Sequence, residues 1–319
     1  MRFGRYKCGL LCLLGCATAA CAEPLPVRDL NPFLSGYEIP PALPAAPPEK
    51  IALLNGLAVS NISLHHHNAH ESVQLDGELQ RLQFGLALPV GDTLGIRLEL
   101  PLVRATGGHL DNFIESFHRT FNLPNGNRGS WPKNRLWIRH SREGVQDFLQ
   151  ADAHGGIGDI TMRIGKRLGD SVDYLNTLWV SLKLPTGDGD KLTGSGSVDM
   201  AVSLAAAQRL GSRFTAQQQV SLSVLGHGER LPTQQKSAVW SGSLGMEASI
   251  SSRWSAIVQV DGHTQVFVTG LRSLGPALQL QIGPRYRSGT WRSEFILSED
   301  LATDTGPDVQ FQLDISRAY

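Results

Sequence analysis

The sequence predicts an all-β protein, an antiparallel up-and-down transmembrane β-barrel of about twelve strands. Three features of the 319-residue chain support this fold class. The N-terminus has the pattern of an export signal, the strands alternate apolar and polar residues, and the connections alternate between short and long. Composition alone does not decide the class, because 41% hydrophobic and 18% charged residues suit a soluble β-sandwich as well as a barrel.

Residues 1–22 have the three parts of a cleavable signal peptide. Three basic residues near the start precede the apolar run 9–17, and Ala20-Cys21-Ala22 forms a small-residue cleavage site. The apolar run is too short to span about 30 Å of hydrocarbon, so we expect cleavage after Ala22 rather than a membrane anchor. A lipoprotein with Cys16 or Cys21 as the lipidated residue is the alternative. All four cysteines lie in this leader, so the mature chain has no disulfide framework.

Removal of the leader leaves a proline-rich segment and a strand-rich body. Segment 23–50 contains eight prolines, which favours a disordered periplasmic tail, and an extended plug inside the barrel is the alternative. Residues 51–319 form the predicted outer-membrane β-barrel, without any apolar stretch that approaches the roughly 18 residues of a membrane helix. The leader removes three of the 29 basic residues and none of the 29 acidic ones, which leaves a net charge of −3. Nothing in this balance indicates a nucleic-acid partner.

Alternation of apolar and polar residues is clearest in the predicted hairpin 82–102. In 82–88 and 94–102 the even-numbered residues are Leu, Ile or Phe, while most odd-numbered residues are polar or small. The same two-residue period recurs, with a less regular first strand, at 57–65, 160–165, 178–184, 198–204, 219–224, 243–250, 254–261, 278–283, 295–297 and 309–315. The count is therefore about twelve strands.

The connections between these segments distinguish a barrel from a sandwich. Short turns lie near 90–93, 169–174, 210–213, 251–253 and 288–290, and longer segments near 65–71, 105–156, 186–196, 226–238, 264–275 and 299–307. Strict alternation of this kind is typical of a barrel with tight periplasmic turns and long outer loops. An even number of strands returns both termini to the periplasmic side. We therefore expect the cell outer membrane as the location.

The last strand carries a predicted assembly signal. Phe311, Leu313 and Ile315 continue in phase to the terminal residue Tyr319, although Arg317 breaks the apolar pattern once. A final strand that ends in an aromatic residue is similar to the signal by which outer-membrane proteins reach the barrel-assembly machinery. We expect this machinery and outer-membrane lipid as partners, together with a small-molecule solute that the sequence does not identify.

Charged residues are expected on the lumen side of the wall. The predicted inward-facing charges are Arg97, Glu99, Arg163, Arg167, Lys183, Asp199, Arg209, Asp261, Arg285, Arg287, Arg292, Glu294 and Asp314. Eight are basic and five are acidic, so they pair across the interior and constrict it. About twelve strands also make a narrower barrel than the 16–18 of porins. The favoured function is a narrow passive channel for small or apolar solutes. The alternatives are a structural or assembly barrel without transport, and a lipid-modifying outer-membrane enzyme.

The longest outer loop contains a predicted amphipathic helix. Its apolar face consists of Leu110, Phe113, Ile114, Phe117 and Phe121, and Pro124 and Gly126 end it. This face must pack over the barrel mouth, on the lipid rim or across a ligand site. We predict that it partly occludes the mouth and acts as a lid that selects solutes.

The remaining polar motifs predict neither a metal site nor an active site. His65, His66, His67 and His70 are the one metal-like cluster, but in a strand His65 and His67 face away from His66, so one ion cannot collect all four. His65 and His67 remain the candidate pair, and we expect no cofactor. His140 and Ser141 point opposite ways in a strand, and the glycine-rich segment 194–197 is typical of a turn. We therefore assign no catalytic residues and expect no enzyme.

Several short motifs resemble an uncharacterised proteobacterial outer-membrane family, a domain of unknown function similar to DUF3187. The matching motifs are Gln74-Leu75-Asp76-Gly77-Glu78, Leu100-Pro101-Leu102, Gly108-His109-Leu110-Asp111, Phe117-His118, Leu123-Pro124-Asn125-Gly126-Asn127-Arg128, Gly158-Asp159-Ile160 and Lys183-Leu184-Pro185-Thr186-Gly187-Asp188. The resemblance spans most of the mature chain and implies a barrel in the outer membrane. It also implies a distant similarity to outer-membrane channels for aromatic and other apolar compounds. No functional residue carries over, because the family brings no established activity.

Overall fold

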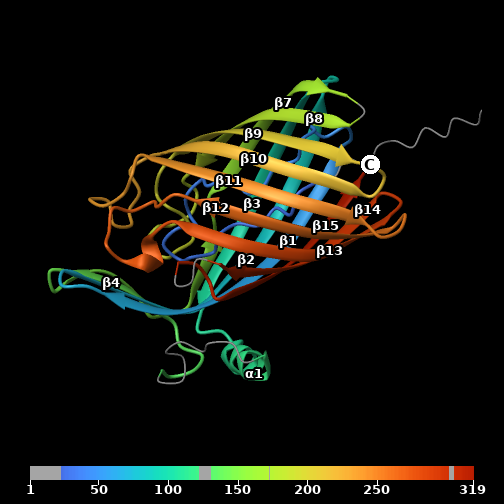
Figure 1. Ribbon diagram of the computed structural model, residues 1–319. Coiled ribbons are helices and arrows are strands. Elements are labelled where there is room, and N and C mark those ends of the chain that lie inside the picture. Colours follow the sequence, from blue (N-terminus) through green and yellow to red (C-terminus); the bar gives the residue numbers. More distant parts are fainter. Residues whose placement is uncertain (1–22, 122–130, 172, 302–304) are drawn as a thin grey trace, which may run out of the picture.

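The structure is a computed structural model that describes residues 23–121, 131–171, 173–301 and 305–319. The expected signal peptide 1–22 lies outside the described residues. Among those described, twelve antiparallel strands form a closed barrel, as the sequence predicts (Figure 1). The wall strands are β1 (Ala52–His67), β2 (Glu71–Val90), β3 (Leu94–Thr106), β7 (Ile160–Asp170), β8 (Tyr174–Leu184), β9 (Asp199–Leu210), β10 (Phe214–Leu225), β11 (Ala238–Ser249), β12 (Trp254–His263), β13 (Ala277–Ser288), β14 (Trp291–Asp300) and β15 (Val309–Ala318).

The barrel closes where the first strand meets the last. β1 pairs with β15 from Ala52↔Ala318 to Asn61↔Val309, and its other edge pairs with β2. Closure gives every wall strand a hydrogen-bonded neighbour on both edges. A sheet in hydrocarbon requires this, because lipid offers no partner to a free backbone N–H or C=O group. No described helix has the length and apolarity that a membrane span requires.

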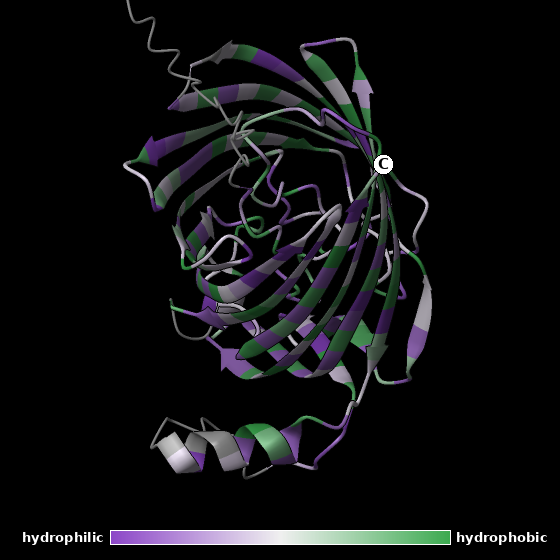
Figure 2. Cartoon of the chain, turned by 90° about the vertical axis from the view of Figure 1, so that its right-hand side faces the viewer, coloured by the Kyte–Doolittle hydropathy of each residue, from purple (hydrophilic) through white to green (hydrophobic). Residues whose placement is uncertain are grey.

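The two-residue period separates an apolar outer surface from a polar interior. On β9 the side chains of Met200, Val202 and Leu204 are exposed on the outside, whereas Ala201 and Ser203 are buried inside. The other wall strands show the same banding (Figure 2). An exposed apolar belt of this extent is stable only when lipid covers it, so the wall spans a membrane.

The tight turns all lie at one end of the barrel, which we call the inner end. β2 and β3 are joined by 91–93, β9 and β10 by 211–213, and β13 and β14 by 289–290. Gly91, Gly211 and Gly289 adopt positive φ there, which these short connections require. The C-terminus lies at the same end (Figure 1).

The outer end differs from the expected pattern at its first connection. The expected long segment 65–71 is a three-residue link, 68–70, because β1 and β2 continue beyond the wall. Their full lengths are 16 and 20 residues. β4 (Trp137–Arg142) pairs with the outer part of β2, and β5 (Val145–Gln150) pairs with β4. The short strand β6 (His154–Ile157) joins the outer part of β3. The long loop 107–159 therefore builds a sheet extension.

Segment 23–50 is not a disordered periplasmic tail, so that expectation is wrong. We call this segment the plug, because it runs through the barrel interior (Figure 2). The strands enclose its side chains, and those of Leu25, Phe33, Tyr37 and Glu38 are fully buried. Proline lacks a backbone N–H, so a proline-rich segment leaves few donors unpaired when it is buried outside a sheet.

Cysteine labelling tests the orientation of the two ends. Residues 23–319 contain no cysteine, so a single introduced thiol gives an unambiguous signal. We expect an impermeant maleimide on intact cells to label Asp190→Cys, which lies in the exposed outer loop between β8 and β9, and to spare Ser212→Cys in the β9–β10 turn. Both should label after lysis. Labelling of Ser212→Cys but not of Asp190→Cys on intact cells would show that the barrel has the opposite orientation.

Candidate functional site

The candidate site is the space between the plug and the barrel wall. Two wall glutamines bind the plug backbone on one side. Gln219 on β10 accepts a hydrogen bond from Leu43 N (2.7 Å) and donates to Pro41 O (3.0 Å). Gln259 on β12 accepts from Leu25 N (2.9 Å) and donates to Leu25 O (2.8 Å). Each amide thus supplies the donor and the acceptor that an extended chain otherwise finds in a neighbouring strand.

β8 completes this side of the contact. Thr177 donates its hydroxyl to Ala45 O (2.7 Å), and the buried Trp179 donates its indole N–H to Pro44 O (2.9 Å). The inward side chains around them are small, including Ser181, Ser203 and Ala205, which gives the plug room to approach. The plug therefore follows the wall formed by β8 to β12.

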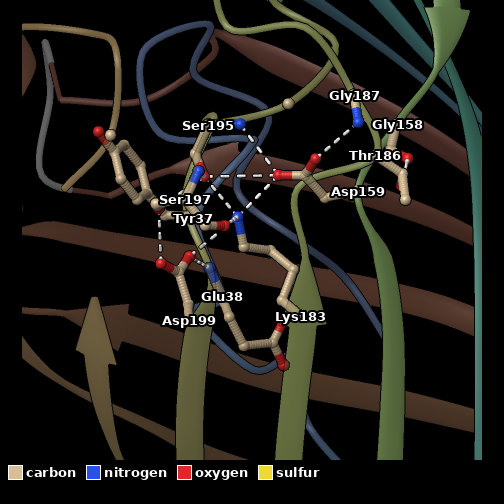
Figure 3. A network of polar contacts seen from close by, with 12 residues as sticks. Tyr37, Glu38, Gly158, Asp159, Lys183, Thr186, Gly187, Ser195, Ser197 and Asp199 are labelled. Atoms are coloured by element: carbon tan, nitrogen blue, oxygen red, sulfur yellow. Dashed lines mark hydrogen bonds and ion pairs between the residues drawn. The ribbon is translucent and has the colours of Figure 1, made fainter. Parts of the chain in front are cut away.

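A buried lysine links the plug to an outer loop (Figure 3). Lys183 Nζ on β8 lies 2.7 Å from Asp159 Oδ2 and 3.1 Å from Asp199 Oδ2, and it also donates to Ser195 Oγ. Asp199 Oδ2 in turn accepts from Glu38 N of the plug at 3.0 Å. Burial of one ammonium between two carboxylates is tolerable only because each partner is held in place.

Asp159 occupies the break between β6 and β7 and receives backbone donors from the loop that follows β8. Gly187 N donates to Asp159 Oδ1 (2.9 Å), and Ser195 N donates to its Oδ2 (2.9 Å). The Gly158-Asp159 and Lys183–Asp188 motifs noted in the sequence are therefore structural. They fold the β8–β9 loop inward over the plug.

A second network joins the plug to β3 and β7. Glu38 of the plug lies 3.0 Å from Arg28 and 2.8 Å from Arg163, and Glu99 lies 3.7 Å and 2.5 Å from the same two arginines. Two cations and two anions thus form a closed ring. A ring of this kind fixes the middle of the plug in one register.

A third network lies toward the inner end. Glu23 at the start of the plug pairs with Arg292 (2.7 Å) and Arg97 (3.5 Å). Arg285 on β13 pairs with Glu294 on the adjacent strand β14 and with Glu247 (2.5 Å) on β11, two strands away. The plug is therefore held by ion pairs at its beginning and in its middle.

The outer end of the lumen is filled by an apolar core. Leu30, Phe33, Leu34 and Tyr37 of the plug pack with residues from the sheet extension and the outer loops. The rings of Phe33 and Phe267 lie 6.5 Å apart, and those of Phe33 and Phe148 lie 5.3 Å apart. No wide water-filled passage crosses this region of the described structure.

The side of the plug away from β8 to β12 leaves a cavity of about 90 Å³ against β1, β2, β3, β14 and β15. Its plug side includes Pro26, Pro41 and Pro44, and its wall side includes Gly56 and Ala58. Ala58 contributes only a methyl group to this lining, whereas the space beside Gly56 is taken by the side chain of Asp314. Any Cβ at position 56 would lie 2.3 Å from Asp314 Oδ1. The volume has room for several water molecules.

Comparison with known proteins agrees with this architecture. The sequence model described as "Protein of unknown function (DUF3187)" matches residues 17–318. The chain belongs to the DUF3187 family. No curated protein matches the sequence.

Solved structures similar to this DUF3187 chain are β-barrels. The crystal structure of the COG4313 outer membrane channel from Pseudomonas putida F1 superposes with a TM-score of 0.57 at 13% identity, covering 87% of this chain and 97% of that one. The NanC porin gives a TM-score of 0.48 at 5% identity, with 84% and 100% covered. The CymD monoaromatic hydrocarbon channel gives 0.38 at 12%, with 85% and 89% covered. At 13% identity, the likeness to the COG4313 channel shows the fold alone.

Most of the predicted lumen charges of the DUF3187 chain lie inside the barrel. Buried or half-buried on the inward face are Arg97, Glu99, Arg163, Lys183, Asp199, Asp261, Arg285, Arg287, Arg292, Glu294 and Asp314. Arg167 reaches Glu49 at the end of the plug (3.3 Å). Arg209 differs, because it is exposed next to the inner-end turn. Glu23, Arg28 and Glu38 were not among the predicted lumen charges, because they belong to the plug, which was expected to be a free tail.

The amphipathic helix forms as predicted, but it is not a lid. Helix α1 (Asp111–Phe121) lies outside the ring of strands (Figure 2). The Phe113 ring lies 6.0 Å from the ring of the outward-facing Phe311, and Asn61 on the outer face of β1 donates to Asp111 (3.0 Å). Aromatic side chains on the outer wall thus provide the apolar surface that the helix needs. Ile114 is buried, and the side chains of Phe117 and Phe121 lie outside the described part of the structure.

Replacement of Phe113 tests this placement. Because the side chain is 54% exposed, Phe113→Ser should cost on the order of 1 kcal/mol of docking energy. We expect several-fold faster limited trypsin cleavage at Arg119 and an unchanged single-channel conductance, with Phe113→Leu as the control. A rise in conductance with Phe113→Ser but not with Phe113→Leu would instead support a role for the helix as a lid.

The histidine cluster and the terminal strand are also placed by the structure. The His65 and His67 rings lie 5.5 Å apart on one face of β1, while His66 turns to Ser273 on the other face. Across the described residues, no three His, Cys, Asp or Glu side chains gather as a metal site requires. Phe311, Leu313 and Ile315 share the outer face of β15, and Tyr319 follows that strand.

Proposed function

We propose that the chain is an outer-membrane channel in which the plug narrows the lumen to a passage for small solutes. The observation that carries this proposal is the cavity between the plug and the β1–β3 and β14–β15 wall. The plug contacts one side of the lumen through Gln219, Gln259 and Trp179. On the other side it is held by ion pairs such as that between Glu23 and Arg292, and the cavity lies between these contacts. The shared fold with a protein described as an outer membrane channel supports the same function.

The proposed location is the outer membrane. The leader 1–22, the apolar outer face and the terminal strand from Phe311 to Tyr319 support it. The barrel-assembly machinery and outer-membrane lipid are the partners that this location implies. We propose no cargo beyond a small solute, because the apolar core around Phe33 and Phe267 leaves no room for a wide pore.

A structural barrel without transport is the second candidate. The apolar core and the three ion-pair networks support it, since together they immobilise the plug. An enzyme has less support. Ser195 beside Lys183 resembles a nucleophile and base by residue type, but Ser195 is 0% exposed, and the Lys183 amine already lies 2.7 Å and 3.1 Å from the carboxylates of Asp159 and Asp199.

Liposome swelling distinguishes a channel from a structural barrel. Liposomes that contain the purified full-length mature chain should swell in glycerol faster than protein-free liposomes. The rate should fall steeply from glycerol to a disaccharide, because the passage is narrow. Heat-denatured protein is the control for leakage. Swelling equal to that control for every solute would overturn the channel and favour the structural barrel.

A further inference from the structure

We infer that the cavity is a binding site for a small monocarboxylate with an apolar body, and that Arg81 binds its carboxylate. The inference rests on the proposed channel, because the cavity is the passage along the plug. Arg81 lies on the inward face of β2 and lines the cavity, with only 9% of the residue exposed. Its Nη2 donates a hydrogen bond to Gln83 Oε1 at 2.8 Å.

Arg81 differs from the other cations of the cavity in having no ionic partner. Arg28, Arg97 and Arg292, which also line it, each lie within 4 Å of a carboxylate. Arg81 makes no ion pair with any residue that the structure describes. A guanidinium has five N–H donors, so one amide oxygen leaves most of them available to a ligand in the cavity.

The charge balance of the neighbourhood points the same way. The ring beside Arg81 contains Arg28 and Arg163 against Glu38 and Glu99, which is neutral by itself. Arg81 therefore adds one uncompensated positive charge. The inner network balances separately, with Arg97, Arg285, Arg287 and Arg292 against Glu23, Glu247, Glu294 and Asp314.

Nearby carboxylates limit the anion that fits. Asp314 and Glu294 on the inner side of the same cavity repel a second negative charge. One carboxylate can meet the single excess charge of Arg81, whereas a dicarboxylate would place its second charge toward Asp314. The site therefore favours a monoanion.

The rest of the cavity is suited to an apolar body. Pro26, Pro41, Pro44 and Ala42 of the plug face Leu54 and Ala58 of β1 across it. These side chains offer no hydrogen bonds, so an alkyl group would be desolvated there without leaving a polar partner unsatisfied. The guanidinium at one side and the proline surface at the other give the ligand an orientation.

Binding of matched four-carbon probes tests the site. Saturation-transfer NMR on the purified full-length mature chain in detergent would give dissociation constants for butyrate, butan-1-ol and butylammonium, corrected for detergent alone. Butyrate should bind about tenfold more tightly than butan-1-ol, the scale of one charge-assisted hydrogen-bonded contact, and butylammonium most weakly. Acetate, which lacks the alkyl body, should bind more weakly than butyrate.

Three variants isolate the role of Arg81. Arg81→Gln should bring butyrate and butan-1-ol to within about twofold of each other, a difference of only a few tenths of a kcal/mol. It breaks no ion pair, so the barrel should remain heat-modifiable on gels. Arg81→Lys should retain part of the preference. Arg209→Gln, an exposed arginine outside the cavity, should leave it unchanged.

The outcomes separate this inference from the proposed channel. Equal binding of the three four-carbon probes by a barrel that swells in glycerol would overturn the carboxylate site and leave the channel intact. An undiminished butyrate preference in Arg81→Gln would also overturn the site. Butyrate selectivity that depends on Arg81, in a barrel without any swelling, would support the site and overturn the channel.

Discussion

Deletion of residues 24–48 should raise the single-channel conductance of the barrel several-fold. The plug fills the lumen with buried side chains from Leu25 to Tyr37 and crosses it again along β8 to β10. Without it, the inward side chains of the wall and the inward-folded outer loops remain in the described barrel, and ions can pass where Phe33 and Tyr37 packed. Planar-bilayer recordings on the full-length and deleted chains measure the difference.

Addition of a synthetic 23–50 peptide provides the matched control. The peptide should lower the conductance of the deleted barrel, because Gln219 and Gln259 still offer the backbone contacts it uses. The deletion also removes Glu38, one of the two carboxylate partners of Arg163, so Gln219→Ala combined with Gln259→Ala is the second variant if assembly fails. That pair keeps all charges and should give frequent brief openings. A folded deletion variant with the conductance of the full-length mature chain would show that the plug does not limit flow.

The wall was predictable because lipid on one side and a polar lumen on the other impose a two-residue period. Each residue of β9 from Met200 to Ala205 follows that period, and the five tight turns were placed from sequence by the residues that interrupt it. The extension of β1 and β2 was missed because His65, His66 and His67 interrupt the apolar pattern without ending the strands.

The plug was not predictable from its own composition. Eight prolines predict a segment that joins no sheet. A free tail and a buried extended segment both meet that condition. The informative signal lay in the wall, where eight basic and five acidic inward positions leave an excess of three positive charges. Segment 23–50 has four acidic and two basic residues, a net charge of −2. An unbalanced lumen beside an acidic segment is a reason to expect that segment inside.

The positions of α1 and of the cavity depend on three-dimensional pairing. The sequence identifies the apolar face around Phe113, but the surface it meets is made by Phe311, almost 200 residues away in the chain. In the same way, nothing in the sequence distinguishes Arg81 from Arg97. The distinction arises because Glu23 of the plug pairs with Arg97, whereas no carboxylate of the described residues forms an ion pair with Arg81.

Replacement of Lys183 by Met should destabilise the folded barrel by about 3–5 kcal/mol, the usual cost of leaving buried charges unpaired. The change leaves Asp159 and Asp199 facing each other without a cation, in a network where both are buried. It also weakens the hold of Asp199 on Glu38 N and so loosens the plug. The measurement is the urea concentration that unfolds the barrel in detergent, followed by heat-modifiable migration and tryptophan fluorescence.

Lys191→Met is the matched control, because its pair with Asp188 (2.9 Å) is solvent-exposed and should contribute little to the stability of the barrel. The triple variant Lys183→Met, Asp159→Asn, Asp199→Asn should recover part of the loss, since neutral amides remove the repulsion and can still accept from Gly187 N and Glu38 N. If Lys183→Met and Lys191→Met unfold at the same urea concentration, the buried network does not stabilise the barrel. The plug would then be held mainly by the Glu38 and Glu99 ring and the apolar core around Phe33.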